Sequence, residues 1–515
     1  MTVLNHIDAQ AQRAGDRAFL IGPETGDTMS CVQLRDNVAL VSAQLDEMGC
    51  RPGDHVAMLM DNGIWTAALL LAVMASGRVA VPLNAIAGDG QLEYVLDHCD
   101  AAILFASPEH EQRAHALAEK VSREIQVVPT CPDRGPHWPS NVDGRGVSLP
   151  MSSPEDHALL MYTSGTTGKP KGVLLTQRNV IAGGQNTVEA HSLSAEDRAL
   201  CVLPLYHINA EIVTVIAPLI SGGSVVMPHR FRTSLFWGWL RDHRCTWFSL
   251  VPTIIAYLLE RGDTDESRVR DNPELARIRF GRSASSALPA ASHLAFEQEF
   301  GIPLIETMGL TETAAQILSN PLPPFQVRYG SPGIAYRNEV KVVADNGQEA
   351  PRGEIGEVMV RGDNVMKQYY KNPDATAEAL SADGWLHTGD LGYQDEEGFF
   401  YITGRLKELI IKGGENIAPR EIDDTLLMHP AVLEAAAYAQ DDEQYGQKIM
   451  ACVVFKSGKT ASEEELKQLC DKEVGKFKTP ENIHVVQWLP RGPSGKIQRL
   501  KIADMLDTLV EGPEQ

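Results

Sequence analysis

Hydrophobic and polar residues follow two different periods along the first 150 residues of the chain. Apolar residues recur at helical spacing over 33–48 and again over 65–76. Residues 55–60 and 102–106 are short apolar runs, which are typical of strands buried on both faces. Because strands alternate with helices in this order, the pattern predicts parallel sheets that are covered by helices.

The same alternation continues beyond residues 130–150, which are rich in Pro, Gly and Asp and are expected to form a surface connection. A periodic segment predicts a helix over 288–300, and short apolar runs predict four more strands. These strands are expected at 157–162, 172–176, 223–227 and 246–251. Together the elements predict one large α/β unit.

The pattern changes in character after residue 330. Short strands at 340–343 and 357–361 are separated by Gly, Asp and Asn turns, so residues 330–403 are expected to form a β-rich subdomain. Beyond Gly404 the chain predicts a second α+β unit of roughly a hundred residues. Its helices are expected at 419–428 and 462–474, and its strands at 432–438 and 449–455.

The length of 515 residues is too great for a single ordinary core, so two or more domains are expected. We place the boundary in the charged segment Gly404-Arg-Leu-Lys-Glu408. The predicted domains are therefore residues 1–404 and 405–515.

Charge and cysteine usage exclude several classes of partner. The formal net charge of −22 creates a field that repels nucleic acid and anionic membranes. The longest apolar stretch, 65–75, is too short to cross a bilayer, and the first ten residues lack the pattern of a signal peptide. The eight cysteines include no CxxC pair, which favours reduced thiols in a cytoplasmic protein. Because the net charge of the chain is strongly negative, an anionic substrate would need a local basic patch to attract it.

The polar segment Thr-Ser-Gly-Thr-Thr-Gly-Lys-Pro-Lys-Gly at 163–172 lies between two predicted strands. Its glycines let backbone N–H groups approach an anion closely, its hydroxyl groups are short donors, and its lysines add positive charge. It is not a Walker A loop, because only two residues separate the glycines and Pro170 follows the first lysine. We expect a phosphate-binding loop; the alternative is an ordinary exposed turn. The residues expected to hold phosphate are Thr163, Ser164, Gly165, Thr166, Thr167, Gly168, Lys169 and Lys171.

This segment resembles the phosphate-binding signature of the acyl-adenylate-forming (ANL) superfamily, which includes acyl-CoA synthetases, the adenylation domains of peptide synthetases, and luciferases. Further motifs follow in the family's order, and the resemblance covers essentially the whole chain. It implies a large N-terminal domain of stacked α/β sheets with a β-rich subdomain. It also implies a smaller, mobile α+β C-terminal domain and an active site between the two domains.

By that resemblance, the motif Gly309-Leu-Thr-Glu-Thr313 lies beside the nucleotide. Thr311 is expected to bond the α-phosphate and Glu312 to hold Mg²⁺, which prefers hard oxygen ligands. Met308 stands where the family usually has an aromatic residue, so a thioether contact with adenine would replace ring stacking. The alternative for this fragment is the start of an amphipathic helix that Thr311 caps.

Three more motifs match the family's nucleotide-handling and mobile segments. In Gly384-Trp-Leu-His-Thr-Gly-Asp390, the carboxylate of Asp390 is expected to accept the ribose hydroxyls. Arg405 is expected to touch ribose or phosphate, and Lys407 matches the hinge about which the small domain turns. In Pro490-Arg-Gly-Pro-Ser-Gly-Lys-Ile-Gln-Arg499, Lys496 matches the catalytic lysine. Each of these is otherwise a plain surface charge or turn.

The segment Lys412-Gly-Gly-Glu-Asn416 matches the part of acyl-CoA synthetases that faces the pantetheine tunnel. Gly413 and Gly414 would leave room there for the narrow thiol arm of coenzyme A. The alternative is a simple turn before a helix that begins at Pro419.

The segments that line the acyl pocket in this family, 203–209, 279–285 and 308–320, are unusually polar here. The run Arg282-Ser-Ala-Ser285, followed by Ser319-Asn-Pro-Leu-Pro323, resembles oxalate–CoA ligases, with sulfoacetate–CoA ligases as the second interpretation. Arg282 matters most, because a buried guanidinium without an anionic partner costs several kcal/mol. A second anionic group on the acid would satisfy it; alternatively Arg282 pairs with a neighbouring Asp or Glu and the acid is neutral. The residues expected to face the acid are His207, Asn209, Arg282, Ser283, Ser285, Met308 and Gln316.

The sequence therefore predicts an ATP-dependent acid–CoA ligase of the AMP-forming acyl-CoA synthetase type. Its expected cofactors are ATP, Mg²⁺ and coenzyme A, and its expected substrate is a short acid with a second anionic group. We expect a cytoplasmic enzyme without nucleic-acid or membrane partners, and the sequence leaves a homodimer open. The alternatives are a ligase for an aromatic or medium-chain acid, an enzyme that loads a carrier protein, a luciferase-type oxygenase, and a nucleotide-binding scaffold.

Overall fold

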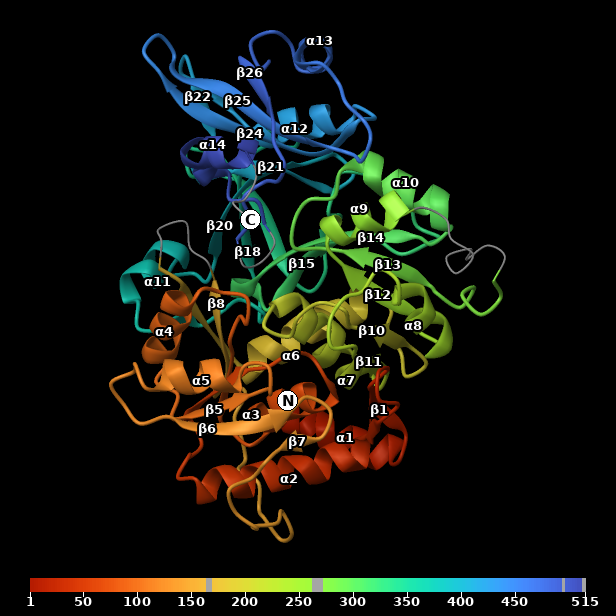
Figure 1. The fold of residues 1–515 in the computed structure, drawn as a ribbon, viewed down its shortest axis with the longest axis vertical. Helices are drawn as coiled ribbons and strands as arrows, with labels where there is room; N and C mark the ends of the chain where they lie inside the picture. Colours follow the sequence, from red (N-terminus) through yellow and green to blue (C-terminus); the bar gives the residue numbers. More distant parts are fainter. Residues whose placement is uncertain (164–168, 262–271, 493–495, 512–515) are drawn as a thin grey trace.

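A computed structural model describes residues 1–163, 169–261, 272–492 and 496–511. Two large sheets form the N-terminal part, which runs from red to green in the lower half of Figure 1, and the blue C-terminal part lies above them. One sheet has nine strands and the other has eight. This arrangement, with a smaller C-terminal domain, confirms the predicted fold class.

The nine-stranded sheet has the order β16-β15-β14-β13-β12-β10-β11-β1-β2. The neighbouring strands in the centre of this sheet, from β14 to β1 in that order, are parallel. At the edges, β2, β15 and β16 pair antiparallel with their neighbours. Its strands are β1 (Ala18–Ile21), β2 (Thr28–Ser30), β10 (Arg198–Leu200), β11 (Ser224–Val226), β12 (Trp247–Leu250), β13 (Phe280–Ser283), β14 (Leu304–Leu310), β15 (Ala315–Ser319) and β16 (Ile334–Ala335).

The eight-stranded sheet has the order β19-β9-β8-β4-β3-β5-β6-β7. Its centre is again parallel, as the alternation of strands and helices predicted, and β9, β19 and β7 are antiparallel additions. Its strands are β3 (His55–Leu59), β4 (Val79–Pro82), β5 (Ile103–Ala106), β6 (Gln126–Cys131), β7 (Gly135–Pro136), β8 (His157–Thr163), β9 (Lys171–Thr176) and β19 (Gln368–Tyr369). The predicted connection over 130–150 thus contains the end of β6 and the short strand β7.

Helices pack the two sheets together into one apolar core. In α3 every residue except Trp65 is buried, which explains why the segment 65–76 reads as almost continuously apolar. Helix α6 contacts β8 and β9 of one sheet and β15 of the other. The N-terminal helices are α1 (Val3–Ala14), α2 (Cys31–Glu47), α3 (Ile64–Ala75), α4 (Asp89–His98), α5 (Glu111–Ala118), α6 (Gln177–Ala190), α7 (Ala217–Ser221), α8 (Phe236–Asp242), α9 (Pro252–Arg261), α10 (Ala290–Phe300) and α11 (Pro373–Ala379), with a π-helix η1 (Asn209–Ile216).

The predicted β-rich part forms a four-stranded antiparallel sheet in the order β17-β18-β20-β21. Its strands are β17 (Glu339–Val343), β18 (Gly356–Arg361), β20 (Leu386–Gln394) and β21 (Phe400–Arg405). The register of β20 against β21 places Asp390 directly opposite Arg405. Strand β21 thus runs one residue past Gly404, after which the short helix η3 (Leu406–Glu408) leads into the C-terminal part.

The C-terminal part has its own five-stranded sheet and its own apolar clusters, in which residues such as Ile410, Leu426 and Val453 are buried. Its strands are β22 (Ile410–Lys412), β23 (Glu415–Ile417), β24 (Val432–Asp442), β25 (Gly446–Phe455) and β26 (Asn482–Val485). Its helices are α12 (Pro419–Leu427), α13 (Glu463–Glu473), η4 (Arg499–Lys501) and α14 (Ile502–Glu511). Across the described ranges of the chain, no helix combines the length and the apolarity needed to cross a membrane.

Gly309 is required where β14 turns back to pair with β15. A Cβ atom added at Gly309 would lie 1.8 Å from the carbonyl oxygen of Ala315, which belongs to the backbone of the paired strand. We expect Gly309→Ala to destabilise the protein by about 2–4 kcal/mol, because the two strands would have to separate. Thermal unfolding followed by circular dichroism measures this loss.

Gly90→Ala is the matched control for that substitution. Gly90 lies in α4, and nothing lies within 4 Å of a Cβ added there. The control should keep or slightly raise the melting temperature, by up to about 1 kcal/mol of helix propensity. Equal melting temperatures for the two variants would contradict the close approach of β14 and β15.

Candidate active site

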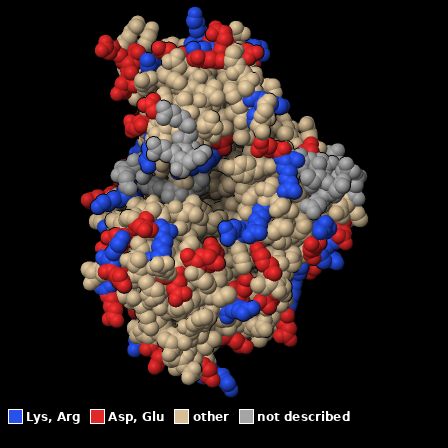
Figure 2. All heavy atoms as spheres, viewed as in Figure 1, with Lys and Arg blue, Asp and Glu red and all other residues tan. Residues whose placement is uncertain are grey.

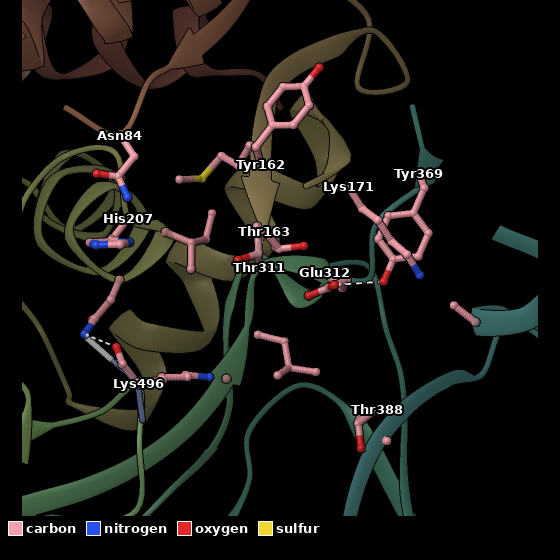
Figure 3. A pocket seen from close by; sticks show the side chains of 18 of the residues that line it. Asn84, Tyr162, Thr163, Lys171, His207, Thr311, Glu312, Tyr369, Thr388 and Lys496 are labelled. Atoms are coloured by element: carbon pink, nitrogen blue, oxygen red, sulfur yellow. Dashed lines mark hydrogen bonds between the residues drawn. The ribbon is translucent and has the colours of Figure 1, made fainter. Parts of the chain in front are cut away.

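A cavity of about 430 Å³ lies where the two large sheets, the four-stranded sheet and the C-terminal part meet. Figure 2 shows a hollow between the small upper part and the large lower part of the molecule. Figure 3 shows how side chains from distant segments converge on this cavity. The residues that the sequence predicted as site residues and that line it are Thr163, Lys171, His207, Asn209, Ser285, Thr311, Glu312, Arg405 and Lys496.

A second cavity of about 330 Å³ adjoins the first. The two cavities share Ser285, Arg405 and Lys496 in their walls. Two predicted residues line the second cavity only. These are Asp390, which was expected to bind ribose, and Met308, which was expected both beside adenine and facing the acid. The structure therefore brings part of the predicted nucleotide and acid residues into two adjoining cavities.

Thr311 and Glu312 lie at the end of β14 in a single 3-10 turn, η2 (Thr311–Thr313). The hydroxyl of Thr313 accepts a hydrogen bond from the Leu310 N–H at 3.0 Å, and Ala314 adopts a left-handed conformation with φ of 44°. These local bonds fix the turn. The alternative of an amphipathic helix capped by Thr311 is therefore wrong, because the chain enters β15 after one turn and Thr313 makes the capping bond.

The carboxylate of Glu312 is held by a residue that sequence reasoning missed. The Tyr369 hydroxyl donates to Glu312 Oε1 at 2.8 Å, and Figure 3 draws this bond. The Lys171 ammonium lies 4.9 Å from the centre of the same ring, a cation–π distance. Tyr369 comes from β19, which pairs with β9, so no local pattern in the sequence could have linked it to Glu312.

Asp390 and Arg405 form an ion pair across β20 and β21, with Arg405 Nε 2.9 Å from Asp390 Oδ1. Asp390 is 5% exposed, and its charge raises the pKa of Arg405 above the ordinary value. The cross-strand register thus presents a carboxylate and a guanidinium side by side at the junction of the two cavities.

Lys496 comes from the C-terminal part of the chain and lines both cavities. The backbone carbonyl oxygen of Lys496 accepts a hydrogen bond from the Gly492 N–H at 2.8 Å. Burial, followed by the charge of Arg405, lowers the pKa of Lys496, whereas the carboxylates of Asp390 and Glu312 oppose that change. An ammonium group is therefore delivered next to Glu312 and Asp390 by a segment far from them in the sequence.

Cations line the main cavity although the chain is strongly acidic, but they do not form the purely basic patch that the sequence predicted, because glutamates line it in equal number. Lys171, Arg405, Lys407 and Lys496 line it together with four glutamates, Glu312, Glu357, Glu378 and Glu408. In the visible face of Figure 2, the remaining acidic and basic residues are interspersed. The charge pattern suits a ligand that carries several negative charges and a metal ion.

Arg282 lies in the wall behind the main cavity and is 2% exposed. Its Nη1 donates to Asn209 Oδ1 at 2.6 Å and to Ser249 Oγ at 3.1 Å, and its Nη2 lies 3.5 Å from Gln316 Oε1. Burial lowers the pKa of Arg282 to about 9. Among the described residues, no Asp or Glu forms an ion pair with Arg282, so the alternative of a protein carboxylate partner finds no support there.

Not all predicted site residues line the two cavities. Arg282, Ser283 and Gln316 are buried and line neither cavity, and Asn209, which does line the main cavity, bonds Arg282. Lys169 lies with its ammonium 5.4 Å from the centre of the Tyr94 ring. Gly413 and Gly414 occupy the exposed turn between β22 and β23, outside both cavities. The remaining predicted phosphate ligands lie outside the described residues: Ser164, Gly165, Thr166, Thr167 and Gly168.

Comparisons with known proteins agree with this geometry. The model of the AMP-binding enzyme family matches residues 7–370, and that of the AMP-binding enzyme C-terminal domain matches residues 421–496. A sulfoacetate–CoA ligase of Cupriavidus necator is 47% identical over 498 residues, which is 96% of this chain and 96% of that protein. An oxalate–CoA ligase of Arabidopsis thaliana is 34% identical over 92% of each chain.

Solved structures show the same fold. ATP-bound MatB from Rhodopseudomonas palustris has a TM-score of 0.89 and 28% identity, and the match covers 98% of this chain and 100% of that one. The o-succinylbenzoate–CoA synthetase of Bacillus subtilis, in complex with ATP and magnesium, has a TM-score of 0.83 and 30% identity over 97% and 99% of the two chains. With a family model that covers most of its length and motifs in the family's order, this chain belongs to the AMP-binding enzyme family, within the acyl-adenylate-forming superfamily.

Proposed function

We propose that this protein is an ATP-dependent acid–CoA ligase for a short acid that carries a second anionic group. The observation that carries the proposal is Arg282, a buried guanidinium with only neutral acceptors, one layer behind the wall of the main cavity. Leaving such a charge without an anion costs several kcal/mol, and an anionic substrate group offsets that cost. Sulfoacetate is the first candidate, because the relative of that specificity is 47% identical, and oxalate is the second.

The proposed reaction has two steps. An oxygen of the acid's carboxylate attacks the α-phosphorus of ATP, an O–P bond forms, and pyrophosphate leaves with the electron pair of the broken P–O bond. The thiol of coenzyme A then attacks the acyl carbon, AMP leaves, and the thiol proton is released. In this proposal the Lys496 ammonium and the Thr311 hydroxyl, which both line the main cavity, stabilise the charge that develops on phosphate oxygens in the first step.

The residues present fit ATP and magnesium. The second cavity, with Met308 and Asp390, suits the nucleoside, and the cations of the main cavity suit the triphosphate. The described residues include no cluster of three or more His, Cys, Asp or Glu for a metal, so Glu312 would share Mg²⁺ with phosphate oxygens, as this ion prefers. Bound magnesium would supply charge neutralisation on the phosphates.

The proposal includes movement of the C-terminal domain, with the boundary after Gly404 and the hinge at Lys407. Lys496 occupies the cavity in this arrangement, whereas Gly413 and Gly414 lie outside it. A rotation that withdraws Lys496 and brings the glycine turn to the cavity would serve the step with coenzyme A. We also propose a cytoplasmic enzyme without nucleic-acid or membrane partners; gel filtration with light scattering would test a homodimer.

The substrate class is tested by release of AMP that depends on coenzyme A. Sulfoacetate should exceed acetate in kcat/KM by roughly 10- to 100-fold, because a charged hydrogen bond contributes about 1.5–3 kcal/mol. Oxalate and 4-coumarate are the other acids to be assayed. A preference for 4-coumarate or fatty acids would contradict the anionic substrate, and turnover with a carrier protein but not with coenzyme A would contradict the acceptor.

Lys496→Ala tests the placement of the chemistry. Loss of one preorganised stabiliser should cost about 3–4 kcal/mol, so exchange of labelled pyrophosphate into ATP should fall roughly 100- to 1,000-fold. Lys501→Ala is the matched control, because Lys501 is an exposed lysine of the same C-terminal segment outside both cavities. Undiminished exchange in the Lys496 variant would place the chemistry elsewhere.

Tyr369→Phe tests whether Glu312 holds the metal. The variant keeps the ring under Lys171 but leaves Glu312 without its hydroxyl donor, so the magnesium concentration for half-maximal exchange should rise roughly tenfold. Mn²⁺ binding in the presence of a non-hydrolysable ATP analogue, read by electron paramagnetic resonance, should weaken to the same extent. Tyr370 is the matched control, because its hydroxyl bonds Asp100 instead, and Tyr370→Phe should change neither measurement. Equal behaviour of the two variants would contradict the proposal that the Tyr369 hydroxyl positions Glu312 for the metal.

A further inference from the structure

Asn209 stands between the buried charge of Arg282 and the main cavity. Its Oδ1 accepts hydrogen bonds from Arg282 Nη1 at 2.6 Å and from Ser249 Oγ at 3.2 Å. A guanidinium can only donate, so the oxygen of the amide must face Arg282 and the NH₂ group must face away from it. The amide therefore has one fixed orientation.

The other end of the amide belongs to the cavity wall. Asn209 Nδ2 lies 3.4 Å from Ser285 Oγ, and both residues line the main cavity. The same cavity is lined by Thr311 and Lys496, where the carboxylate of the acid would react. The wall thus presents an amide NH₂ and a hydroxyl to a ligand whose far end meets the phosphate-side residues.

Arg282 does not line either cavity itself. It is fixed on β13 between β12 and β14, where it lies opposite Ser249 in the strand register and bonds Asn209, Ser249 and Gln316. Direct contact with a substrate would require the Asn209 side chain to move and both bonds to its Oδ1 to break. The influence of the guanidinium on the cavity consequently passes through the Asn209 amide, which it orients and polarises.

Asn209 is also the first residue of the π-helix η1, all of whose residues are buried. π-helices are rare and often occur at functional sites. The buried helix and the two bonds to Oδ1 leave the Asn209 side chain little freedom, as a selective contact requires.

We infer that Asn209, with Ser285, is the residue that contacts the second anionic group of the acid, and that Arg282 is a positioning residue that acts through Asn209. Sulfonate and carboxylate groups only accept hydrogen bonds, so they complement the NH₂ and hydroxyl donors at this wall. The inference rests on the proposed function, because it names the side chains that would give the ligase its substrate class.

A double-mutant cycle separates this inference from direct contact by Arg282. The variants are Asn209→Ala, Arg282→Gln and the double variant, and the readout is the ratio of kcat/KM for sulfoacetate to that for acetate. Using acetate as the internal reference cancels defects in folding and in ATP binding. Each single variant should lower the ratio on the order of 10- to 100-fold, and the double variant should lower it no further than the larger single effect. Additive losses would overturn the positioning role of Arg282.

Asn209→Asp provides an independent test, because it replaces an amide that can donate to an anion with a negatively charged carboxylate. The new carboxylate would pair with Arg282 and present negative charge to the cavity, so the ratio of kcat/KM for sulfoacetate to that for acetate should fall more than 100-fold. The melting temperature should stay the same or rise, because the guanidinium gains an anionic partner. A purely structural Asn209 would instead lose both substrates together and melt earlier, which would overturn the inference.

Different results would contradict the proposed function and the role of Asn209. A wild-type enzyme that does not prefer anionic acids over acetate overturns the proposed function and the inference together. A wild-type preference for sulfoacetate that survives Asn209→Asp overturns the inference alone. Ser249→Ala, which removes one of the two donors to Asn209 Oδ1 without altering the cavity lining, should lower the ratio less than Asn209→Ala does.

Discussion

A guanidinium buried among neutral acceptors is the constraint on which the proposed acid-binding end of this protein depends. Arg282 is held by Asn209, Ser249 and Gln316, which satisfy part of its hydrogen-bonding capacity but none of its charge. Such an arrangement costs stability in the empty protein, as the lowered pKa of Arg282 reflects. Because Arg282 lies one layer behind the wall of the main cavity, we propose that a ligand of opposite charge recovers this cost on binding.

On the side proposed for the phosphates, by contrast, Asp390 and Glu312 each have a partner that fixes the position of the carboxylate. Asp390 and Arg405 are neighbours because the register of β20 and β21 places them opposite each other. Glu312 is held by the Tyr369 hydroxyl in a turn that depends on the close approach of β14 and β15. Preorganised charges of this kind are ready for a polyanionic nucleotide without rearrangement at the moment of reaction.

The position of the C-terminal part places the lysine predicted for adenylation in the cavity, but not the glycines predicted for the step with coenzyme A. Lys496 lies in the cavity, whereas the turn with Gly413 and Gly414 is exposed elsewhere on the same domain. One rigid arrangement cannot bring both to the same reacting atoms. Sharing one cavity between two successive steps is the physical reason for proposing a mobile small domain with its own core.

Local sequence determined the elements and the family. Helices such as α2 and strands such as β3 and β5 agree with prediction because periodicity and apolar runs depend on neighbouring residues alone. The motifs around Thr311, Asp390 and Lys496 likewise identified the superfamily, since each is a contiguous segment. Only the tertiary structure decided the antiparallel edges of the sheets, the bond from Tyr369 to Glu312, and the position of Asn209 in front of Arg282. These features depend on the pairing of strands and on contacts between segments far apart in the chain, and no local pattern records which side chain will stand between a buried charge and a cavity.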